Sequence, residues 1–406
     1  MLSFEEARRK IIEVTKKILR TPAIEKVQLG SALSRILAQD IVADRDYPPF
    51  DRAARDGFAV RAADCREPGA MLRVTGEIRA GAAPSASVGA GECMQIMTGA
   101  AVPAGADAVV MIEYTRPGAQ RSQVVIERTA QAGMNFVPRG SEAHMGDVLL
   151  KRGARLGDAE LALAAQIGCA ELAVHRKPRV AILSTGDEVV AVETKPGPFE
   201  IRNSNSVSLA AQAALAGAEA IVLGNAPDRH DELRNAIESG LGEDILVISG
   251  GVSMGKYDLV EGALRELGAE FFFDAVDIRP GRPAVFGVCQ GKPVFGLPGN
   301  PVSTLVTFEL FVVPAIDVLG GSEPRPLPLL KARLAKAVEK KAALTHFAPA
   351  LLEWAEGEAT VTELEWKGSG DIGTVARANC FLVVPQVKLK IAAGEWVDVL
   401  PRRGLL

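Results

Sequence analysis

Residues 178–188 of the chain are PRVAILSTGDE, an apolar run that ends in small and acidic residues. Such a run predicts a buried strand followed by a loop. Three further runs of this kind follow, separated by amphipathic stretches typical of helices. The strands are predicted at 180–183, 220–223, 245–248 and 294–295, and the helices at 206–216, 231–239 and 258–267. This alternation indicates a three-layer α/β domain at 177–323, with a mostly parallel sheet covered by helices on both faces.

The chain outside this region divides into further parts. Residues 324–406 begin with a proline-rich stretch and continue in short alternating runs, which predicts a C-terminal β-barrel or sandwich, of which we take the barrel. Residues 47–138 contain apolar runs separated by glycines and prolines, which predicts an inserted all-β module. Amphipathic or alanine-rich helices are expected in the flanking segments, 1–46 and 139–176. If these helices pack side by side, the two segments form one elongated helical and linker domain that carries the β module.

Composition limits the class of protein. The 406 residues are enough for two to four domains of roughly 150 residues each. A net charge of −4 gives no overall field for a nucleic-acid backbone, so no nucleic-acid partner is expected. Five cysteines without metal-ligand spacing favour a reducing compartment. The acidic N-terminus does not resemble a signal peptide, and no run of about 18 uninterrupted apolar residues occurs. We therefore expect a soluble cytoplasmic protein with no membrane partner.

Small residues follow the predicted strands of the α/β domain. Because ligands bind beyond the carboxyl ends of strands in an open parallel sheet, these loops are the first candidates for a binding site. Their backbone N–H groups can approach phosphate oxygens closely, and their hydroxyl groups can donate hydrogen bonds. The sequence therefore predicts a phosphorylated small molecule as the ligand. The candidate binding residues are Thr185, Gly186, Ser249, Gly250, Gly251, Ser253, Pro298, Gly299, Asn300 and Ser303.

Four acidic residues accompany these loops, namely Asp187, Glu188, Asp228 and Asp258. They would repel a phosphate unless a hard divalent cation such as Mg²⁺ lies between, since carboxylates and phosphates share such ions. Asp228 and Asp258 immediately precede predicted helices, where Asp is also a preferred N-cap residue. Cation binding and helix capping therefore both stay open for these two positions.

The segment Gly250–Lys256 nearly matches the phosphate loop of nucleotide-hydrolysing proteins. Tyr257 stands where that loop needs Ser or Thr. Because the hydroxyl group that would hold Mg²⁺ is absent, we expect no ATP hydrolysis at this segment.

A second candidate for anion binding is the segment 279–283, which follows an aromatic strand. Arg279 and Arg282 are held at a fixed spacing by Pro280 and Pro283. Two guanidinium groups on a loop restricted by prolines make a rigid fork for oxyanions. A solvent-facing turn is the alternative interpretation.

Two loops of the β module also carry polar residues. One contains Asp56–Gly57 and the other Thr98–Gly99. A hairpin turn alone explains an Asp-Gly pair, and the second loop is equally explained as a connection. The residue types by themselves do not assign a function to either loop.

Taken together, these segments are more specific than any one of them. In their order along the chain they resemble the molybdopterin molybdenumtransferase family, which includes MoeA and the E domain of gephyrin. The resemblance covers nearly the whole chain. The matching motifs are Pro48–Asp51 with Asp56–Ala59, Met97–Ala100, Ser184–Glu188, Arg202–Asn205, Ser249–Ser253, Pro280–Gly281 with Pro283, and Gly296–Pro301.

The resemblance implies an elongated homodimer that acts in molybdenum cofactor biosynthesis. The family takes adenylated molybdopterin and molybdate and releases molybdenum cofactor and AMP, with a divalent cation such as Mg²⁺ assisting. The α/β domain is expected to bind molybdopterin, and the β module of the other subunit to close the site. The enzyme that adenylates molybdopterin is a candidate partner. A non-enzymatic dimeric scaffold of the gephyrin type is the alternative function.

The resemblance also implies roles for single residues. Asp228 and Asp258 are expected to bind the cation with support from Glu188, and Asp56 to orient the adenylate or the attacking group. The residues expected to act in catalysis are Asp56, Thr98, Glu188 and Asp258, and those added to the substrate-binding set are Asp187, Asn205, Arg279, Pro280, Arg282 and Pro283.

The chain departs from the family pattern in two segments. Arg52–Ala53, Arg55 and Phe58 stand where the family commonly has Asn-Ser, Met and Tyr. Arg279 and Arg282 stand where the family commonly has lysines, which keeps the charge but replaces a point donor by a planar fork.

Overall fold

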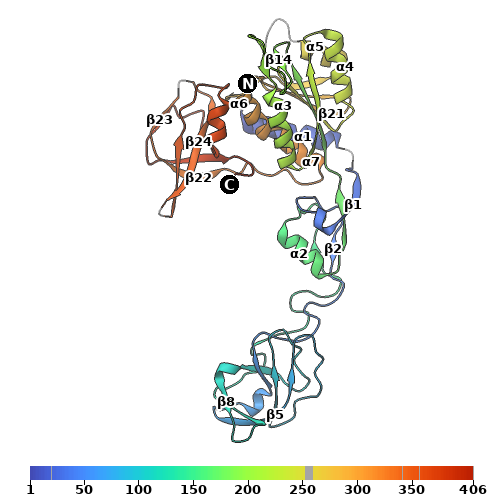
Figure 1. Cartoon of the computed structure of the whole chain (residues 1–406), viewed down its shortest axis with the longest axis vertical. Helices are drawn as coiled ribbons and strands as arrows, with labels where there is room; N and C mark the ends of the chain where they lie inside the picture. The colour runs from blue at the N-terminus through green and yellow to red at the C-terminus, as the bar shows by residue number, and fades with distance from the viewer. Residues whose placement is uncertain (20, 252–258, 341, 356, 406) are drawn as a thin grey trace. The chain divides into compact units, whose positions relative to one another are not determined.

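The structure is a computed structural model that describes residues 1–19, 21–251, 259–340, 342–355 and 357–405. The chain forms two compact units, each described by itself (Figure 1). Unit 1 comprises residues 1–38, 153–161 and 171–406, and unit 2 comprises residues 39–152 and 162–170.

A six-stranded sheet forms the centre of unit 1, in the order β16–β13–β17–β21–β20–β18. The first four strands in this order are parallel. β20 pairs antiparallel with β21, and β18 pairs antiparallel with β20. The strands are β13 (Arg179–Thr185), β16 (Glu219–Ala226), β17 (Ile245–Ser249), β18 (Glu270–Phe273), β20 (Val285–Cys289) and β21 (Lys292–Leu297). The predicted mostly parallel sheet is confirmed. β20, which forms an antiparallel hairpin with β21, is not among the predicted strands.

Helices cover both faces of this sheet, which confirms the predicted three-layer arrangement (Figure 1). On one face, α4 and α5 contribute a stripe of Leu, Ile, Val and Ala to the core. On the other face, α1, α3, α6 and α7 share a larger core with the aromatic residues of β20 and β21. The helices are α1 (Phe4–Ile18), α3 (Ser204–Ala216), α4 (His230–Gly240), α5 (Leu259–Glu266), α6 (Pro301–Thr307) and α7 (Val313–Leu319).

The N-terminal helix α1 belongs to the core of the α/β region. Phe4, Ala7 and Ile11 are buried there, and the Phe4 ring packs edge-on against Phe347 at 5.5 Å between centroids. The interpretation that α1 packs beside the alanine-rich helix, α2 (Asp158–Gln166), is therefore wrong. The apolar stripe of α1 finds its partner in α7, which lies beside it in the same core.

One continuous helical run, Pro301–Leu319, is long and apolar enough to cross a membrane, with a mean hydropathy of 1.9. It consists of α6, a π-helical turn (Phe308–Val312) and α7. Because 83% of the apolar window is buried inside unit 1, the run is explained as a core helix.

Two short strand pairs flank the sheet in unit 1. β1 (Ile24–Gln28) pairs antiparallel with β12 (Glu171–His175), and a 3-10 turn (Leu29–Ser31) follows β1. β14 (Val189–Val190) and β15 (Ile201–Arg202) form a parallel pair after β13.

The C-terminal part of unit 1 is a closed five-stranded barrel, as predicted. Its strands follow the order β24–β25–β22–β28–β26, and β26 closes the ring onto β24. β19 (Ile278–Arg279) pairs with the start of β24 and so ties the barrel to the α/β region. The elements are β22 (Leu330–Leu334), β23 (Val338–Glu339), β24 (Thr345–Ala355), β25 (Glu358–Glu363), α8 (Ile372–Arg377), β26 (Cys380–Val384), β27 (Lys390–Ile391) and β28 (Trp396–Pro401).

Unit 2 contains the predicted inserted all-β module. A six-stranded sheet in the order β7–β4–β6–β5–β9–β8 buries apolar side chains on both faces. The elements are β2 (Ile41–Val42), β3 (Arg52–Ala53), β4 (Gly57–Val60), a 3-10 turn (Ala62–Asp64), β5 (Ala70–Ile78), β6 (Glu92–Ile96), β7 (Ala108–Met111), a second 3-10 turn (Ile112–Tyr114), β8 (Thr115–Pro117), β9 (Gln123–Ile126), β10 (Phe136–Val137) and β11 (Val148–Leu150).

Candidate functional site

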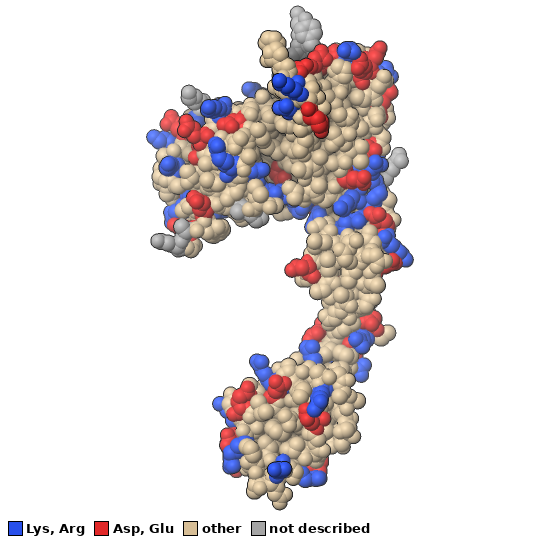
Figure 2. Space-filling view, in the orientation of Figure 1, with Lys and Arg blue, Asp and Glu red and all other residues tan. Residues whose placement is uncertain are grey.

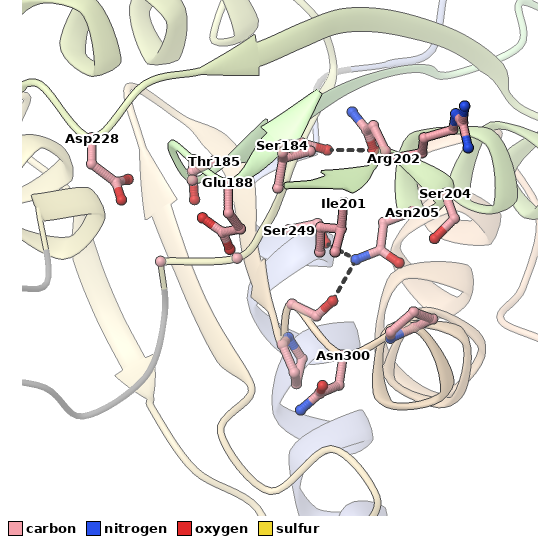
Figure 3. A pocket seen from close by; sticks show the side chains of 18 of the residues that line it. Ser184, Thr185, Glu188, Ile201, Arg202, Ser204, Asn205, Asp228, Ser249 and Asn300 are labelled. Atoms are coloured by element: carbon pink, nitrogen blue, oxygen red, sulfur yellow. Dashed lines mark hydrogen bonds between the residues drawn. The ribbon is translucent and has the colours of Figure 1, made fainter. Parts of the chain in front are cut away.

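A pocket of about 410 Å³ lies at the carboxyl ends of β13, β17 and β21 in unit 1 (Figure 3). This is the place where an open parallel sheet offers loops and helix N-termini to a ligand. The pocket brings together most of the residues predicted from the strand-end loops. The predicted residues that line it are Thr185, Gly186, Glu188, Asn205, Asp228, Ser249, Gly250, Gly251, Pro283, Pro298, Gly299 and Asn300.

Hydrogen bonds between side chains fix the start of α3 against the end of β13. Asn203 is the N-cap residue of α3, and its side-chain oxygen accepts from the backbone N–H of Ser206 at 3.0 Å. The Ser184 hydroxyl, at the end of β13, donates to the same oxygen at 3.1 Å. The helix N-terminus, with its partial positive charge and free N–H groups, is thereby held at the pocket.

Asn205 in the first turn of α3 joins three elements across the pocket. Its amide nitrogen donates to the Ser249 hydroxyl at 2.8 Å and to the Gly299 carbonyl at 2.7 Å (Figure 3). Its side-chain oxygen is buried and accepts no hydrogen bond from any described residue. The Thr185 hydroxyl is also buried, and it has no hydrogen-bond partner among the described residues. Because buried polar groups are normally paired, these two atoms indicate where a ligand supplies the missing partners.

Two glycines of the pocket are required by the local backbone. Gly250 has φ +95°, and a Cβ there would lie 2.8 Å from the Thr185 carbonyl oxygen. Gly186 has φ +127°, and its Cβ would lie 2.5 Å from a carboxylate oxygen of Glu188. Both positions therefore need a residue without a side chain. The result is a loop whose backbone a ligand can approach closely.

Two carboxylates, Glu188 and Asp228, line the pocket, and Figure 3 shows them toward the same end of it. The pKa of Asp228 lies above its usual value, first because the group is partly removed from water and then because Asp187 and Glu188 are negative neighbours. Asp187 also accepts a hydrogen bond from the Asp228 backbone N–H at 3.1 Å. This end of the pocket therefore carries an excess of negative charge.

Asp228 does not cap a helix. The N-cap residue of α4 is Arg229, and it makes no side-chain capping hydrogen bond. The capping alternative is therefore wrong for Asp228. Asp258, Ser253 and the rest of the segment 252–258 lie outside the described residues, so both interpretations stay open for Asp258.

Of the predicted binding residues that the structure describes, five do not line the pocket. Asp187 is exposed beside it, and Ser303 is buried within α6. Pro280 is buried after a cis peptide bond with Arg279. Arg279 and Arg282 are exposed, and the Arg282 Nε contacts the Met1 sulfur at 3.4 Å. Of the proline loop, only Pro283 reaches the pocket wall.

In unit 2, Asp56 and Thr98 form one compact contact. A single carboxylate oxygen of Asp56 accepts from the Thr98 backbone N–H at 2.6 Å and from the Thr98 hydroxyl at 2.9 Å. These two hydrogen bonds lower the pKa of Asp56, because they stabilise its charged form. The two residues named from separate loops of the sequence are thus in direct contact.

Three of the positions that depart from the family pattern lie in the same unit. Ala53 and Phe58 are buried, and Arg52 pairs with Glu142 at 3.1 Å.

Arg202 is a site residue that the sequence did not predict, although it begins the matching motif Arg202–Asn205. Arg202 lines the pocket, and its Nε donates to the Thr194 carbonyl at 3.1 Å. On the face shown in Figure 2, basic and acidic side chains are intermixed over the surface. An anion therefore has to be attracted by charges close to its site. The sequence feature that could have identified Arg202 is a basic residue shortly before the start of a predicted helix. The other lining residues not chosen beforehand are Ser184, Val189, Ile201, Asn203, Ser204 and Pro301.

Three family models match consecutive parts of the chain. The MoeA N-terminal region (domain I and II) matches residues 2–168, and the MoeA C-terminal region (domain IV) matches residues 331–401. Between them, residues 181–318 match a probable molybdopterin binding domain, which is the part that contains the pocket.

Whole-chain relatives show the same similarity. A molybdopterin molybdenumtransferase of Bacillus subtilis is 37% identical over 383 residues, which covers 93% of this chain and 89% of the relative. One from Staphylococcus epidermidis is 33% identical and covers 96% of this chain and 94% of the relative. A crystal structure of a molybdopterin biosynthesis MoeA protein from Pyrococcus horikoshii has a TM-score of 0.81 at 27% identity, covering 99% of this chain and 100% of that chain.

Proposed function

The chain belongs to the molybdopterin molybdenumtransferase family, and we propose that it inserts molybdate into adenylated molybdopterin and releases molybdenum cofactor and AMP. It is an enzyme of molybdenum cofactor biosynthesis. The curated relatives carry the name of the enzyme, which favours this function over a scaffold of the gephyrin type. The observation that carries the proposal is the pocket itself, where unpartnered Thr185 and Asn205 atoms lie with helix α3 and two carboxylates.

The pocket offers complementary groups for a phosphorylated pterin. The Thr185 hydroxyl and the N–H groups of the first turn of α3 suit phosphate oxygens. The Asn205 oxygen is an acceptor and suits an N–H group of a heteroaromatic ring. Molybdate and the substrate phosphates are all anions, so positioning and charge neutralisation should supply most of the rate acceleration.

A divalent cation fits the acidic end of the pocket. Within the described ranges, no three His, Cys, Asp or Glu side chains are grouped to hold a metal by themselves. Mg²⁺ is commonly bound by one or two carboxylates together with substrate phosphates, which matches Glu188 and Asp228 beside a phosphate site. We propose these two residues, together with Asp258, as the cation ligands. The bound cation would neutralise charge on the adenylate phosphate.

We also propose a homodimer in which Asp56 and Thr98 of one subunit complete the pocket of the other. The support is that the acidic groups fall into two separately folded units, one with Asp56 and one with Glu188 and Asp228. In this arrangement the Asp56 carboxylate orients the adenylate or the attacking group.

Subunit sharing predicts complementation between two inactive variants. Asp56→Ala and Glu188→Gln homodimers should both be nearly inactive. A heterodimer purified through two different affinity tags should regain about half of the wild-type turnover, because one of its two sites then has both residues intact. AMP release measures this recovery. A heterodimer of confirmed composition that stays inactive would exclude shared sites.

A direct assay tests the proposed function. Purified protein is incubated with adenylated molybdopterin, molybdate and Mg²⁺, and AMP and molybdenum cofactor are measured over time. We expect both products to form together and to depend on molybdate. Consumption of the adenylate without cofactor formation would contradict the proposal.

We place the reaction in the cytoplasm, in keeping with the five cysteines, all of which are free thiols. We keep the division into segments 1–46 with 139–176, 47–138, 177–323 and 324–406 as the proposed functional domains, with helix α1 of the first segment packed into the core of the third. The enzyme that adenylates molybdopterin is the proposed protein partner, since it makes the substrate of this reaction.

A further inference from the structure

Arg202 is the only Lys or Arg among the described residues that line the site pocket. The acidic side chains that line it are Glu188 and Asp228. Figure 3 shows these two carboxylates toward one end of the pocket, and Arg202 with Ser204 and Asn205 of helix α3 toward the other. The charges of the pocket are therefore separated into an acidic end and a basic end.

Neighbouring contacts hold Arg202 in place. The residue pairs with Val190 across the parallel strands β14 and β15. The Nε of its guanidinium group donates to the Thr194 carbonyl at 3.1 Å. No described residue accepts a hydrogen bond from its terminal nitrogens, Nη1 and Nη2. The end of the side chain is thus available to bind an oxyanion through two parallel hydrogen bonds.

The start of α3 supplies further donors beside Arg202. The first N–H groups of a helix have no partner within it, and the Asn203 side chain caps only the third of them, at 3.0 Å. The N–H groups of Ser204 and Asn205 remain, at the positive end of the helix dipole. In the wall of the same pocket, Thr185 is 4% exposed and its hydroxyl group has no partner among the described residues. These donors together favour an oxyanion as the ligand of the basic end.

We propose that Arg202 binds the phosphate that molybdopterin itself carries. This inference rests on the proposed function. Adenylated molybdopterin has two linked phosphates, that of the pterin and that of the adenylate. The acidic end of the pocket can accept a phosphate only through a cation, and the Mg²⁺ proposed there neutralises the adenylate phosphate. The phosphate of the pterin then meets Arg202 and the N-terminus of α3, which need no metal ion to hold it.

A comparison of ligands with and without this phosphate tests the contact. Molybdopterin and dephosphorylated molybdopterin are titrated into the protein, and the Kd is measured by quenching of pterin fluorescence, which needs no turnover. Arg202→Gln should raise the Kd of molybdopterin about tenfold or more, because a charge-assisted contact is lost. The Kd of the dephosphorylated ligand should stay unchanged. Arg202→Lys should recover part of the affinity, since the charge remains and the planar fork is lost.

Turnover gives a second readout. In Arg202→Gln the KM for adenylated molybdopterin should rise with kcat little changed, because the phosphate is held equally in the ground state and the transition state. The Ki of AMP should stay at the wild-type value, since AMP carries only the adenylate phosphate. Arg234→Gln on α4 is the matched control and should bind all ligands like the wild type. Arg234 pairs with Glu238 of its own helix at 3.4 Å and does not line the pocket.

Three results would overturn the inference. An unchanged Kd of molybdopterin in Arg202→Gln would mean that the guanidinium group does not contact the ligand. Equal losses of affinity for both pterin ligands would restrict Arg202 to holding the neighbouring loop through the Thr194 carbonyl. A raised Ki of AMP would assign the guanidinium group to the adenylate phosphate.

Failure of the proposed function has a different signature. A wild-type protein whose affinity for molybdopterin depends on Arg202 and on the phosphate, but which releases no AMP, would overturn the proposed function. The same result would leave the contact between Arg202 and the phosphate supported.

Discussion

Asp228→Asn is expected to lower the rate of AMP release by about a hundredfold or more at limiting Mg²⁺, with the fold unchanged. The side chain keeps its size and one acceptor oxygen, so only the charge is lost. If Asp228 is a cation ligand, the apparent affinity for Mg²⁺ falls, and part of the rate returns at high Mg²⁺. The measurements are AMP release as a function of Mg²⁺ concentration and Mg²⁺ binding by calorimetry.

The structure makes this result interpretable, because Asp228 has no part in capping α4. Loss of activity therefore cannot come from a weakened helix start. Removal of one negative charge from the group formed with Asp187 and Glu188 should also not destabilise the fold, since the neighbouring charges repel Asp228. An unchanged thermal unfolding midpoint is expected.

Asp231→Asn is the matched control. Asp231 lies three residues further along, in the first turn of α4, and its side chain is 96% exposed beside His230. It does not line the pocket, so this variant should keep wild-type turnover and Mg²⁺ dependence. If Asp228→Asn turns over like the wild type at limiting Mg²⁺, the cation must be held by other groups.

The α/β core was predictable because its strands are short apolar runs that stop at small residues. The apolar stretch 180–183 became the centre of β13, and the Ser184–Glu188 loop after it became one wall of the pocket. Position at the carboxyl end of a parallel strand decides this outcome, and periodicity reveals such ends. The sequence therefore indicated the pocket wall without any knowledge of distant contacts.

The partner of α1 was not predictable in the same way. The sequence shows that α1 has one apolar stripe, but many apolar surfaces can cover it, and α7 does so in the structure. Likewise, Arg279 and Arg282 looked like a phosphate fork because prolines fix their spacing. The spacing of residues along a loop does not determine which way the loop faces, and only Pro283 reaches the pocket.

Asp317→Ala is expected to destabilise unit 1 by about 3 kcal/mol or more, because it breaks a buried charge network by removing one partner. The Asp317 side chain is 1% exposed. One of its oxygens accepts from Arg155 at 3.1 Å and from Arg325 at 2.6 Å, and the other accepts from the Arg325 Nε and backbone N–H, both at 3.0 Å. Thermal unfolding should show a midpoint lowered by roughly 6 °C.

Asp317 joins the end of helix α7 to two other segments of unit 1, the one that contains Arg155 and the one that leads into the barrel through Arg325. Without the carboxylate, two guanidinium groups face each other, and burial and the Arg325 charge already lower the pKa of Arg155. The exposed pair between Lys16 and Glu323 is the matched control. Glu323→Ala should leave the midpoint almost unchanged, since exposed ion pairs contribute little.

A double-mutant cycle then separates the buried charge from simple loss of packing. If the cost of Asp317→Ala comes from an uncompensated Arg325, the double variant Asp317→Ala/Arg325→Ala should be less destabilised than the sum of the two single variants. Strict additivity would mean that the two side chains stabilise unit 1 independently. In that case the interaction free energy between Asp317 and Arg325 would be close to zero.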